Sequence, residues 1–306
     1  MAAVCGVLWY CGTAAFFITL FPQNTMPFSA SLFVPVFGLI VVGDEILSGR
    51  RADRHLPHCA DLLAQRGLHL SWARYVGDEP QRLTHTIRQA WEEGGAVFCT
   101  GGIGATPDDY TRQCAAEALG VPIEPHAEAI ALIDARSRAM AQERGLPYDP
   151  EAPDNRQRRI MGHLPRGAWL LPNPYNGIAG FALGQPGEGR VLYFMPGFPV
   201  MAWPMMEQAL GRDWAACFAP QCWQERSIIV RGEGEAVLTP LMERIEAQHP
   251  QVKVFSLPSM DHPEYGRHIE LGVKGSPAAV APAWAALKEG LAAFSSLRCG
   301  PEFSRP

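Results

Sequence analysis

Three glycines and two adjacent aspartates lie between an apolar run and an expected helix in this 306-residue chain. Residues 97–100 predict a buried strand, Gly101 begins a tight loop, and Asp108 and Asp109 stand at the expected helix start. Glycines let the backbone approach a ligand closely, and the first N–H groups of a helix point at an anion. Because two carboxylates would repel a bare phosphate, the pattern predicts a phosphate site that also holds a divalent cation. The alternative is that the two aspartates only cap the helix.

A second pair of carboxylates follows the first expected strand. Residues 36–42 form a continuous apolar run with β-branched side chains, and Gly43, Asp44 and Glu45 come directly after it. Such a run is typical of a strand buried on both faces of a parallel sheet. The carboxyl ends of these strands form the edge where open α/β sheets bind ligands. We therefore add this loop to the site, with an ordinary turn as the alternative.

A rigid loop ends another expected strand. Residues 191–195 are apolar and lead into a Pro-Gly-Phe-Pro sequence that begins with Pro196 and Gly197. Rigid loops beyond strand ends hold ligands, although Pro-Gly turns also occur as simple connections. We count Gly43, Pro196 and Gly197 among the candidate ligand-binding residues.

Strands and helices alternate along most of the chain. Besides the runs above, strand 68–76 and the amphipathic helices 53–66, 81–93, 110–119 and 125–144 are expected. This alternation predicts an α/β domain over residues 35–212, with a largely parallel, doubly wound sheet.

The composition changes near residues 212–224, where aromatic residues, cysteines and prolines cluster without periodicity. We place a domain boundary there. Beyond it we expect strands at 227–231, 252–257 and 268–273 and helices at 235–248 and 279–294. This β-α-β-β-α order predicts a small α+β domain over residues 225–296, with its helices on one face of a mixed sheet.

The composition limits the class of protein. The net charge is -5, 47% of residues are hydrophobic and 19% are charged, which suffices for real cores. A nucleic-acid binder would carry a basic stripe, so we expect no nucleic-acid partner. Eight cysteines without a CxxC pair predict reduced thiols in a cytoplasmic protein rather than a structural zinc site.

Residues 1–34 are apolar and irregular. The run 14–21 is similar to the hydrophobic part of a signal peptide, but no Lys or Arg precedes it. It ends at Pro22 and is too short for a convincing membrane span. Because Met26 precedes the first expected strand, we interpret residues 1–34 as a disordered or non-native leader, with a membrane anchor as the alternative.

Three further groups of polar residues receive a weaker interpretation. His55 and His58 have no third ligand near them in sequence, so we expect surface residues. Arg156 and Arg159 would project together from a helix and could meet a phosphate, or could form a solvated face. The acidic and histidine residues of the loop 261–264 are interpreted as a solvated turn rather than a metal site.

Four loops, taken in order, resemble the MoaB/Mog molybdopterin-binding domain. More closely, they resemble the amino-terminal part of the competence/damage-inducible protein A (CinA) family. These loops are residues 43–49, 101–112, 171–174 and 196–199, and the segments 232–235 and 254–258 also fit. Each loop alone is a weak signal, but the four together are specific.

The resemblance implies a three-layer α/β fold with a mostly parallel sheet, usually in a homo-oligomer. It implies a small-molecule ligand, molybdopterin or a nucleotide, bound with a divalent metal such as Mg, Mn or Co. Carried over by motif, Asp44 and Asp109 are the catalytic candidates, and Asp44, Asp108 and Asp109 would face the metal. The implied phosphate cradle consists of Gly101, Gly102, Gly104, Thr106 and Thr111.

This chain departs from the CinA pattern in two ways. The carboxyl-terminal amidase domain is absent from this sequence, so nicotinamide-nucleotide deamidation is not expected. Where CinA proteins tend to carry Ser-Glu after the Pro-Gly-x-Pro loop, this chain has Val200 and Met201. The lost carboxylate weakens the case for hydrolysis and leaves binding untouched.

Three functions therefore stay open. The first is a metal-dependent hydrolase that cleaves the pyrophosphate of ADP-ribose, because a cation can neutralise the phosphates and activate water while a free carboxylate serves as general base. The second is a molybdopterin-binding protein, either an adenylylating enzyme of molybdenum cofactor biosynthesis or a carrier without chemistry. The third is a regulatory relative that binds a nucleotide. No membrane partner is expected for any of them.

Overall fold

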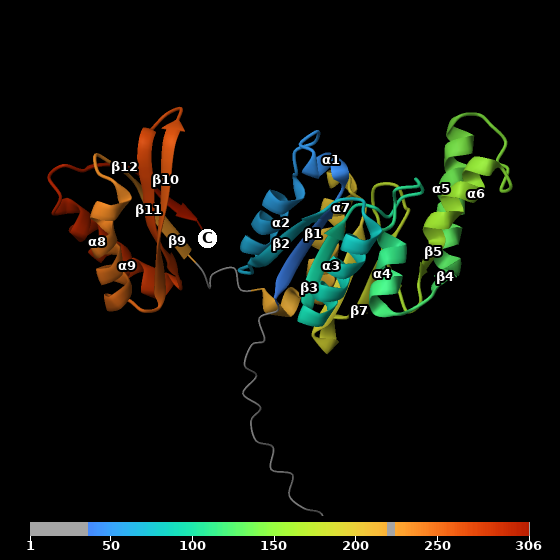
Figure 1. Cartoon of the computed structure of the whole chain (residues 1–306), viewed down its shortest axis with the longest axis horizontal. Coiled ribbons are helices and arrows are strands. Elements are labelled where there is room, and N and C mark those ends of the chain that lie inside the picture. Colours follow the sequence, from blue (N-terminus) through green and yellow to red (C-terminus); the bar gives the residue numbers. More distant parts are fainter. Residues whose placement is uncertain (1–35, 219–223, 306) are drawn as a thin grey trace, which may run out of the picture. The chain divides into compact units, whose positions relative to one another are not determined.

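The computed structural model describes residues 36–218 and 224–305 (Figure 1). The expected leader, residues 1–34, lies outside the described residues. Two main sheets are present, one on each side of residues 219–223 in the sequence. The domain limits 35–212 and 225–296 stay a prediction, and the two sheets are described separately below.

The first sheet has six strands in the order β2-β1-β3-β8-β7-β6. Its strands are β1 (Phe37–Val42), β2 (Leu70–Val76), β3 (Gly95–Thr100), β6 (Trp169–Leu171), β7 (Gly180–Gln185) and β8 (Arg190–Met195). The pairs among β2, β1, β3 and β8 are parallel, whereas β7 and β6 run antiparallel. All residues of β1 and β3 are buried, as their continuous apolar runs predicted.

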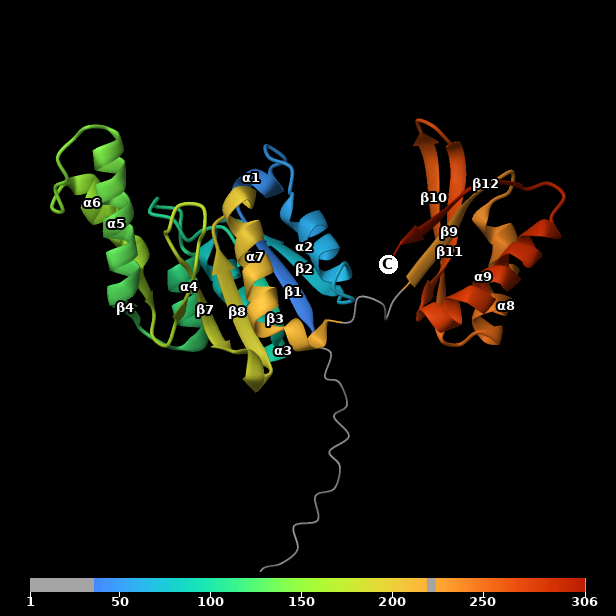
Figure 2. The same ribbon diagram turned by 180° about the vertical axis from the view of Figure 1, so that it is seen from behind.

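Helices cover both faces of this sheet (Figures 1 and 2). On one face, α2 (His55–Ala64) and α7 (Pro199–Asp213) pack on Phe37, Leu39 and Val41 of β1. On the other, α3 (Pro80–Glu93) and α4 (Thr111–Leu119) pack with Ile40 and Val42. Alternate residues of one strand thus enter two different cores. The three-layer α/β fold with a mostly parallel sheet is confirmed.

Two segments besides the covering helices belong to this part of the chain, namely the short helix α1 and the segment from β4 to β5. The short helix α1 (Asp44–Leu47) follows β1 directly. Between α4 and β6 the chain forms β4 (Ile123–Pro125), α5 (Ala127–Glu143), α6 (Pro153–Arg159) and β5 (His163–Pro165), and β4 and β5 pair antiparallel. The Gln157 side chain of α6 donates a 2.6 Å hydrogen bond to the carbonyl oxygen of Ala105, so α6 reaches the glycine loop.

The second sheet has four strands in the order β10-β11-β9-β12. Its elements are β9 (Gln224–Arg231), α8 (Glu235–Gln248), β10 (Val252–His262), β11 (Gly266–Gly275), α9 (Pro277–Ala292) and β12 (Arg298–Arg305). Helices α8 and α9 share one hydrophobic core with the sheet. The expected mixed sheet is wrong, because every pairing is antiparallel. The last strand, β12, was not expected because Gly300 and Pro301 interrupt its pattern, and the β12–β9 register shifts between Cys299 and Glu302.

Membrane-spanning helices and cysteines are considered for the described residues only. No helix among residues 36–218 and 224–305 is both long and apolar enough to cross a membrane. The cysteines Cys59, Cys99 and Cys114 are free and buried, and burial raises the pKa of the Cys59 thiol to about 12. Buried thiols with raised pKa values are poor nucleophiles.

Candidate functional site

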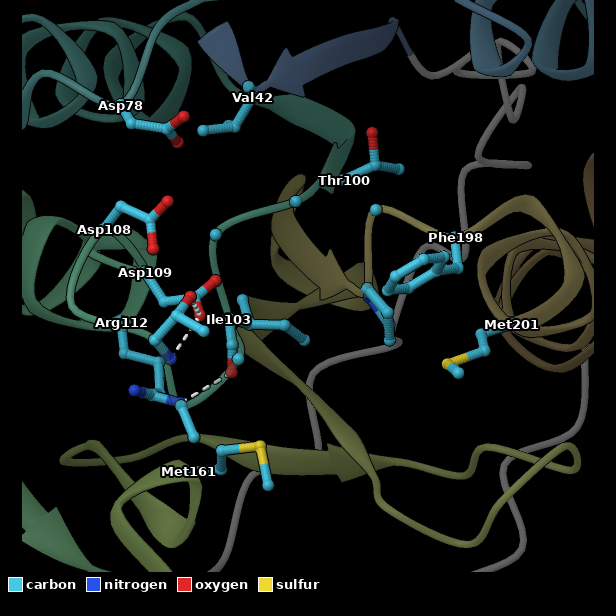
Figure 3. A pocket seen from close by; sticks show the side chains of 18 of the residues that line it. Val42, Asp78, Thr100, Ile103, Asp108, Asp109, Arg112, Met161, Phe198 and Met201 are labelled. Carbon is cyan, nitrogen blue, oxygen red and sulfur yellow. Dashed lines mark hydrogen bonds between the residues drawn. The ribbon is translucent and has the colours of Figure 1, made fainter. Parts of the chain in front are cut away.

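A cavity of about 430 Å³ lies at the carboxyl ends of β1, β3 and β8 (Figure 3). The three loops singled out in the sequence all contribute to its wall. The predicted site residues that line it are Gly43, Gly101, Gly102, Gly104, Thr106, Asp108, Asp109, Pro196 and Gly197. Asp44 and Thr111 do not line it.

The glycine loop needs glycine at two positions. Gly101 has φ +104° and Gly102 has φ +65°, a backbone region that other residues rarely adopt. A Cβ on Gly101 would collide with the carbonyl oxygen of Val42, and one on Gly102 would collide with the hydroxyl of Thr111. The loop is therefore compact, and its backbone is held against β1 and the start of α4.

Thr111 holds this loop from inside the protein. Its side chain is fully buried, and its hydroxyl donates to the carbonyl oxygen of Gly101 at 2.9 Å. Its backbone N–H donates to the carbonyl oxygen of Gly102 at 2.9 Å. Thr111 thus sets the loop conformation and lies behind the wall of the cavity.

The two adjacent aspartates occupy different environments. The Asp109 carboxylate accepts hydrogen bonds from the N–H of Thr106, at 2.8 Å, and from the hydroxyl of Thr106. A Cβ on Gly104 would lie 2.5 Å from the same Asp109 oxygen, so the loop wraps tightly around this carboxylate. Asp108 is exposed, and the neighbouring polar side chain of Thr106, followed by its own backbone N–H, lowers its pKa.

Asp44 is paired with Asp78, a residue that sequence reasoning had not assigned to the site. The N–H of Asp44 donates to the Asp78 carboxylate at 3.0 Å, and the N–H of Asp78 donates to the Asp44 carboxylate at 3.1 Å. Asp78 lines the cavity. Burial raises its pKa, and the charges of Asp44, Glu45 and Asp108 raise it further. Its position directly after β2 is the same signal that identified Asp44 after β1.

The predicted metal trio is not assembled. Within residues 36–218 and 224–305, no group of three or more His, Cys, Asp or Glu side chains is placed to hold a metal ion. Asp109 is bonded within its own loop, and Asp44 does not line the cavity. The residues Asp44, Asp108 and Asp109 therefore do not form a preformed cation site.

Arg112 supplies a positive charge that the sequence analysis did not assign to the site. Its residue is only 3% exposed, and Nη1 donates to the carbonyl oxygen of Ile103 at 2.6 Å (Figure 3). Burial lowers its pKa, and the charge of Asp109 acts in the opposite direction. Arg112 lines the cavity, and its bond to Ile103 holds the glycine loop at a second point besides Thr111. Its place one residue into α4, after the loop, is the signal that could have found it.

The expectation that His55 lies on the surface is wrong. His55 is 4% exposed, lines the cavity, and places Nε2 3.1 Å from the carbonyl oxygen of Gly197. Burial lowers its pKa, so the neutral imidazole is favoured. His58 stacks against the indole of Trp203, with ring centroids 4.1 Å apart.

The basic residues of α6 do not gather at the cavity. Arg159 forms an ion pair with Asp134, with Nε 2.7 Å from Oδ1, so its positive charge is neutralised by that neighbour. Arg156 is exposed and does not line the cavity.

In the β10–β11 hairpin, the His262 ring stacks on Tyr265 and accepts backbone N–H bonds, which is a turn geometry.

Apolar side chains form the other part of the cavity wall. Met161, Phe198 and Met201 line it, and Phe198 and Met201 lie opposite Asp78 and Asp108 in Figure 3. Met201 occupies the position where the CinA pattern tends to have a carboxylate. The cavity is thus polar along the glycine loop and apolar on the facing side.

The fold and the site together define an α/β protein with a cavity at the carboxyl edge of a mostly parallel sheet, against a glycine loop at a helix start. Residues 38–213 match the family described as a probable molybdopterin binding domain, and the chain belongs to this family. The match covers the six-stranded sheet and its helices.

Similar proteins include CinA-like sequences. A protein of Pyrobaculum arsenaticum is 32% identical over 220 residues, 72% of this chain and 78% of its own length. A CinA-like protein of Citrifermentans bemidjiense is 30% identical over 67% of this chain and 46% of its own length. This chain thus spans about half of that relative. The resemblance to CinA proteins stated from the four loops is confirmed.

Two solved structures are similar to part of this chain. The CinA protein of Thermoplasma acidophilum is 24% identical, with a TM-score of 0.48 over 58% of this chain and 97% of its own. The MoaB enzyme of Thermus thermophilus is 18% identical, with a TM-score of 0.36 over 58% of this chain and 90% of its own.

Proposed function

We propose that the cavity binds a phosphorylated pterin of the molybdopterin type, with its phosphate on the glycine loop. The observation that carries the proposal is the compact loop from Gly101 to Thr106 at the start of α4, with the buried Arg112 beside it. Backbone N–H groups at a helix start and a guanidinium are the donors that recognise phosphate. Family membership supports the pterin as the ligand.

The apolar wall supports a planar ring at the other end of the ligand. Met161, Phe181 and Met201 line the cavity. Thioether and aromatic groups pack well against a flat heterocycle. The volume of about 430 Å³ suits a single small molecule with both a ring and a phosphate.

The second candidate function is hydrolysis of the ADP-ribose pyrophosphate. It is favoured by the cavity-lining Asp78, whose pKa is raised by burial and by the charges of Asp44, Glu45 and Asp108. A carboxyl group with a raised pKa is suited to proton transfer during bond cleavage. Met201 in place of a carboxylate counts against this activity.

Direct titration tests the binding proposal. Purified protein is titrated calorimetrically with a pterin monophosphate and with AMP, and the Asp109→Ala and Asp61→Ala variants are titrated in the same way. Asp109→Ala removes the acceptor of the Thr106 N–H, so the loop should loosen and affinity should fall about tenfold or more. Asp61 is an exposed residue of α2 away from the cavity, and its variant serves as the control. Wild-type protein that binds neither probe would refute the proposal.

A product assay tests the hydrolase. The protein is incubated with ADP-ribose, with or without Mg²⁺, Mn²⁺ or Co²⁺, and AMP and ribose 5-phosphate are sought by chromatography. Product formed by the wild type and not by Asp78→Asn supports hydrolysis, and no product with any cation rejects it. The expected homo-oligomer is tested on the same preparation by sedimentation.

A further inference from the structure

The helices α5 and α6 and the short helical turn η1 (Ile160–Gly162) form an arm that holds itself together. Arg159 of α6 donates two hydrogen bonds to the Asp134 carboxylate of α5, at 2.7 and 3.0 Å. The buried Asn155 side chain donates to the carbonyl oxygen of Asp149 at 2.7 Å. The two helices lie next to each other in Figures 1 and 2, and these bonds make them one unit.

The arm is connected to the rest of the domain through β4 and β5, which pair with each other over three residues each. Leu164 of β5 belongs to the hydrophobic core that includes α3 and α4, and it anchors the foot of the arm. Gly120 and Gly167 flank this connection with φ +67° and +84°, and a Cβ on either would contact nothing. Glycines at both sides of a short connection absorb small backbone rotations. The arm can therefore turn about its foot while its own bonds stay intact.

The arm touches the glycine loop through Gln157. Its Nε2 donates to the carbonyl oxygen of Ala105 at 2.6 Å, and Ala105 lines the cavity. The Gln157 side chain is exposed, so water replaces either partner when the two separate. The net free energy of such a bond is small, so the contact can open and close readily. The bond from Arg112 to Ile103 does not involve the arm and holds the loop in either case.

The arm also supplies part of the cavity wall. Met161 of η1 and Leu164 of β5 line the cavity, and Figure 3 shows Met161 below the Arg112 side chain. A ligand on the glycine loop that reaches Met161 contacts both the loop and the arm. Because both contacts exist together only when the arm is closed, such a ligand stabilises the closed arm.

We propose that the α5–α6 arm is a clamp that closes on the ligand after it has entered the cavity. Gln157 is the positioning residue that holds the closed arm on the glycine loop. This inference rests on the proposed function, because it needs a ligand in the cavity. A closed clamp slows the escape of the ligand and contributes little to the first encounter. Gln157 therefore acts on the dissociation rate constant.

Stopped-flow fluorescence tests the clamp, because a pterin monophosphate is itself fluorescent. Association and dissociation rate constants for this probe are measured on the full chain and on three variants. Gln157→Leu removes the donor and keeps a side chain of similar size, whereas Gln157→Arg keeps a donor. Gln142→Ala is the control, because Gln142 is an exposed glutamine of α5 that does not line the cavity.

We expect Gln157→Leu to raise the dissociation rate constant about three- to tenfold and to change the association rate constant by less than about twofold. Gln157→Arg and Gln142→Ala should both dissociate within about twofold of the wild-type rate. A residue that only shaped the loop would instead slow association, because fewer molecules would be ready to bind. That result, or an unchanged dissociation rate for Gln157→Leu, overturns the clamp and leaves the proposed function intact. Wild-type protein that does not bind the probe overturns the proposed function and the clamp together.

Discussion

Replacing Thr111 by Val should loosen the glycine loop while keeping the shape of the core. The Thr111 hydroxyl is fully buried and donates to the carbonyl oxygen of Gly101 at 2.9 Å. Valine has nearly the same volume but no donor, so this carbonyl loses a buried partner. The loss of such a bond destabilises a protein by about 1.5 kcal/mol. For a domain of this size, that change lowers the melting temperature by roughly 3–6 °C.

The matched variant is Thr111→Ser, which keeps the donor and removes one methyl group. Thermal unfolding followed by circular dichroism measures stability, and calorimetric titration with a pterin monophosphate measures the loop. We expect Thr111→Ser to lose about 0.8 kcal/mol and to bind normally. Thr111→Val should bind about tenfold more weakly because the Gly101 carbonyl no longer fixes the loop.

One pattern of results would refute this reasoning. If Thr111→Val were as stable as the wild type and yet bound the ligand poorly, the hydroxyl would contact the ligand itself. That is the phosphate-cradling role implied by family resemblance. Unchanged stability together with unchanged affinity would show that the bond to Gly101 contributes nothing to either property.

Three further predictions concern the aspartates. Asp78→Asn should raise the melting temperature at pH 7, because burial and the neighbouring carboxylates raise the pKa of Asp78 and so penalise its ionised form. In melting curves from pH 3 to 7, the stability gained by Asp78→Asn should disappear below the ordinary pKa of 3.8. Asp53→Asn should destabilise the protein near neutral pH, because hydrogen bonds from His55, Tyr75 and Leu56 outweigh burial and lower the pKa of Asp53. In the same melting series, the difference in melting temperature from wild type should persist above pH 3.8 and shrink as the pH falls below it. Asp108→Ala removes an exposed negative charge beside the loop, so a phosphate ligand should bind about two- to threefold more tightly in cation-free titrations, whereas weaker binding would show that Asp108 helps to attract the ligand.

The fold of the first sheet could be predicted because its signals are local. The runs of β1 and β3 are apolar throughout, and a strand buried on both faces requires that pattern. The antiparallel pairing of the second sheet could not be predicted, because the direction of a strand depends on contacts between distant segments. Strand β12 was missed because Gly300 and Pro301 indicate a turn, although the register shift lets the ladder continue past them.

Some features of the candidate site could also be predicted from local sequence, and others could not. The three loops that line the cavity were predicted because each follows a buried strand, and the carboxyl ends of parallel strands must meet. Asp78 follows β2 as Asp44 follows β1, so the same rule places it at this edge, but its pairing with Asp44 and the burial of His55 could not be predicted from the residues near them. Asp78 acquires its environment from Asp44, 34 residues earlier, and His55 from the carbonyl of Gly197, 142 residues later.

The two adjacent aspartates show why residue types alone did not decide the chemistry. In the sequence, Asp108 and Asp109 are equivalent carboxylates and suggest a shared cation. In the structure, the Asp109 carboxylate accepts the N–H and hydroxyl of Thr106, so it holds the loop closed from within. Asp108 is exposed and remains free to meet solvent or a ligand. One aspartate therefore shapes the glycine loop and the other sets the charge beside it, and a substitution at each site separates loop geometry from electrostatics.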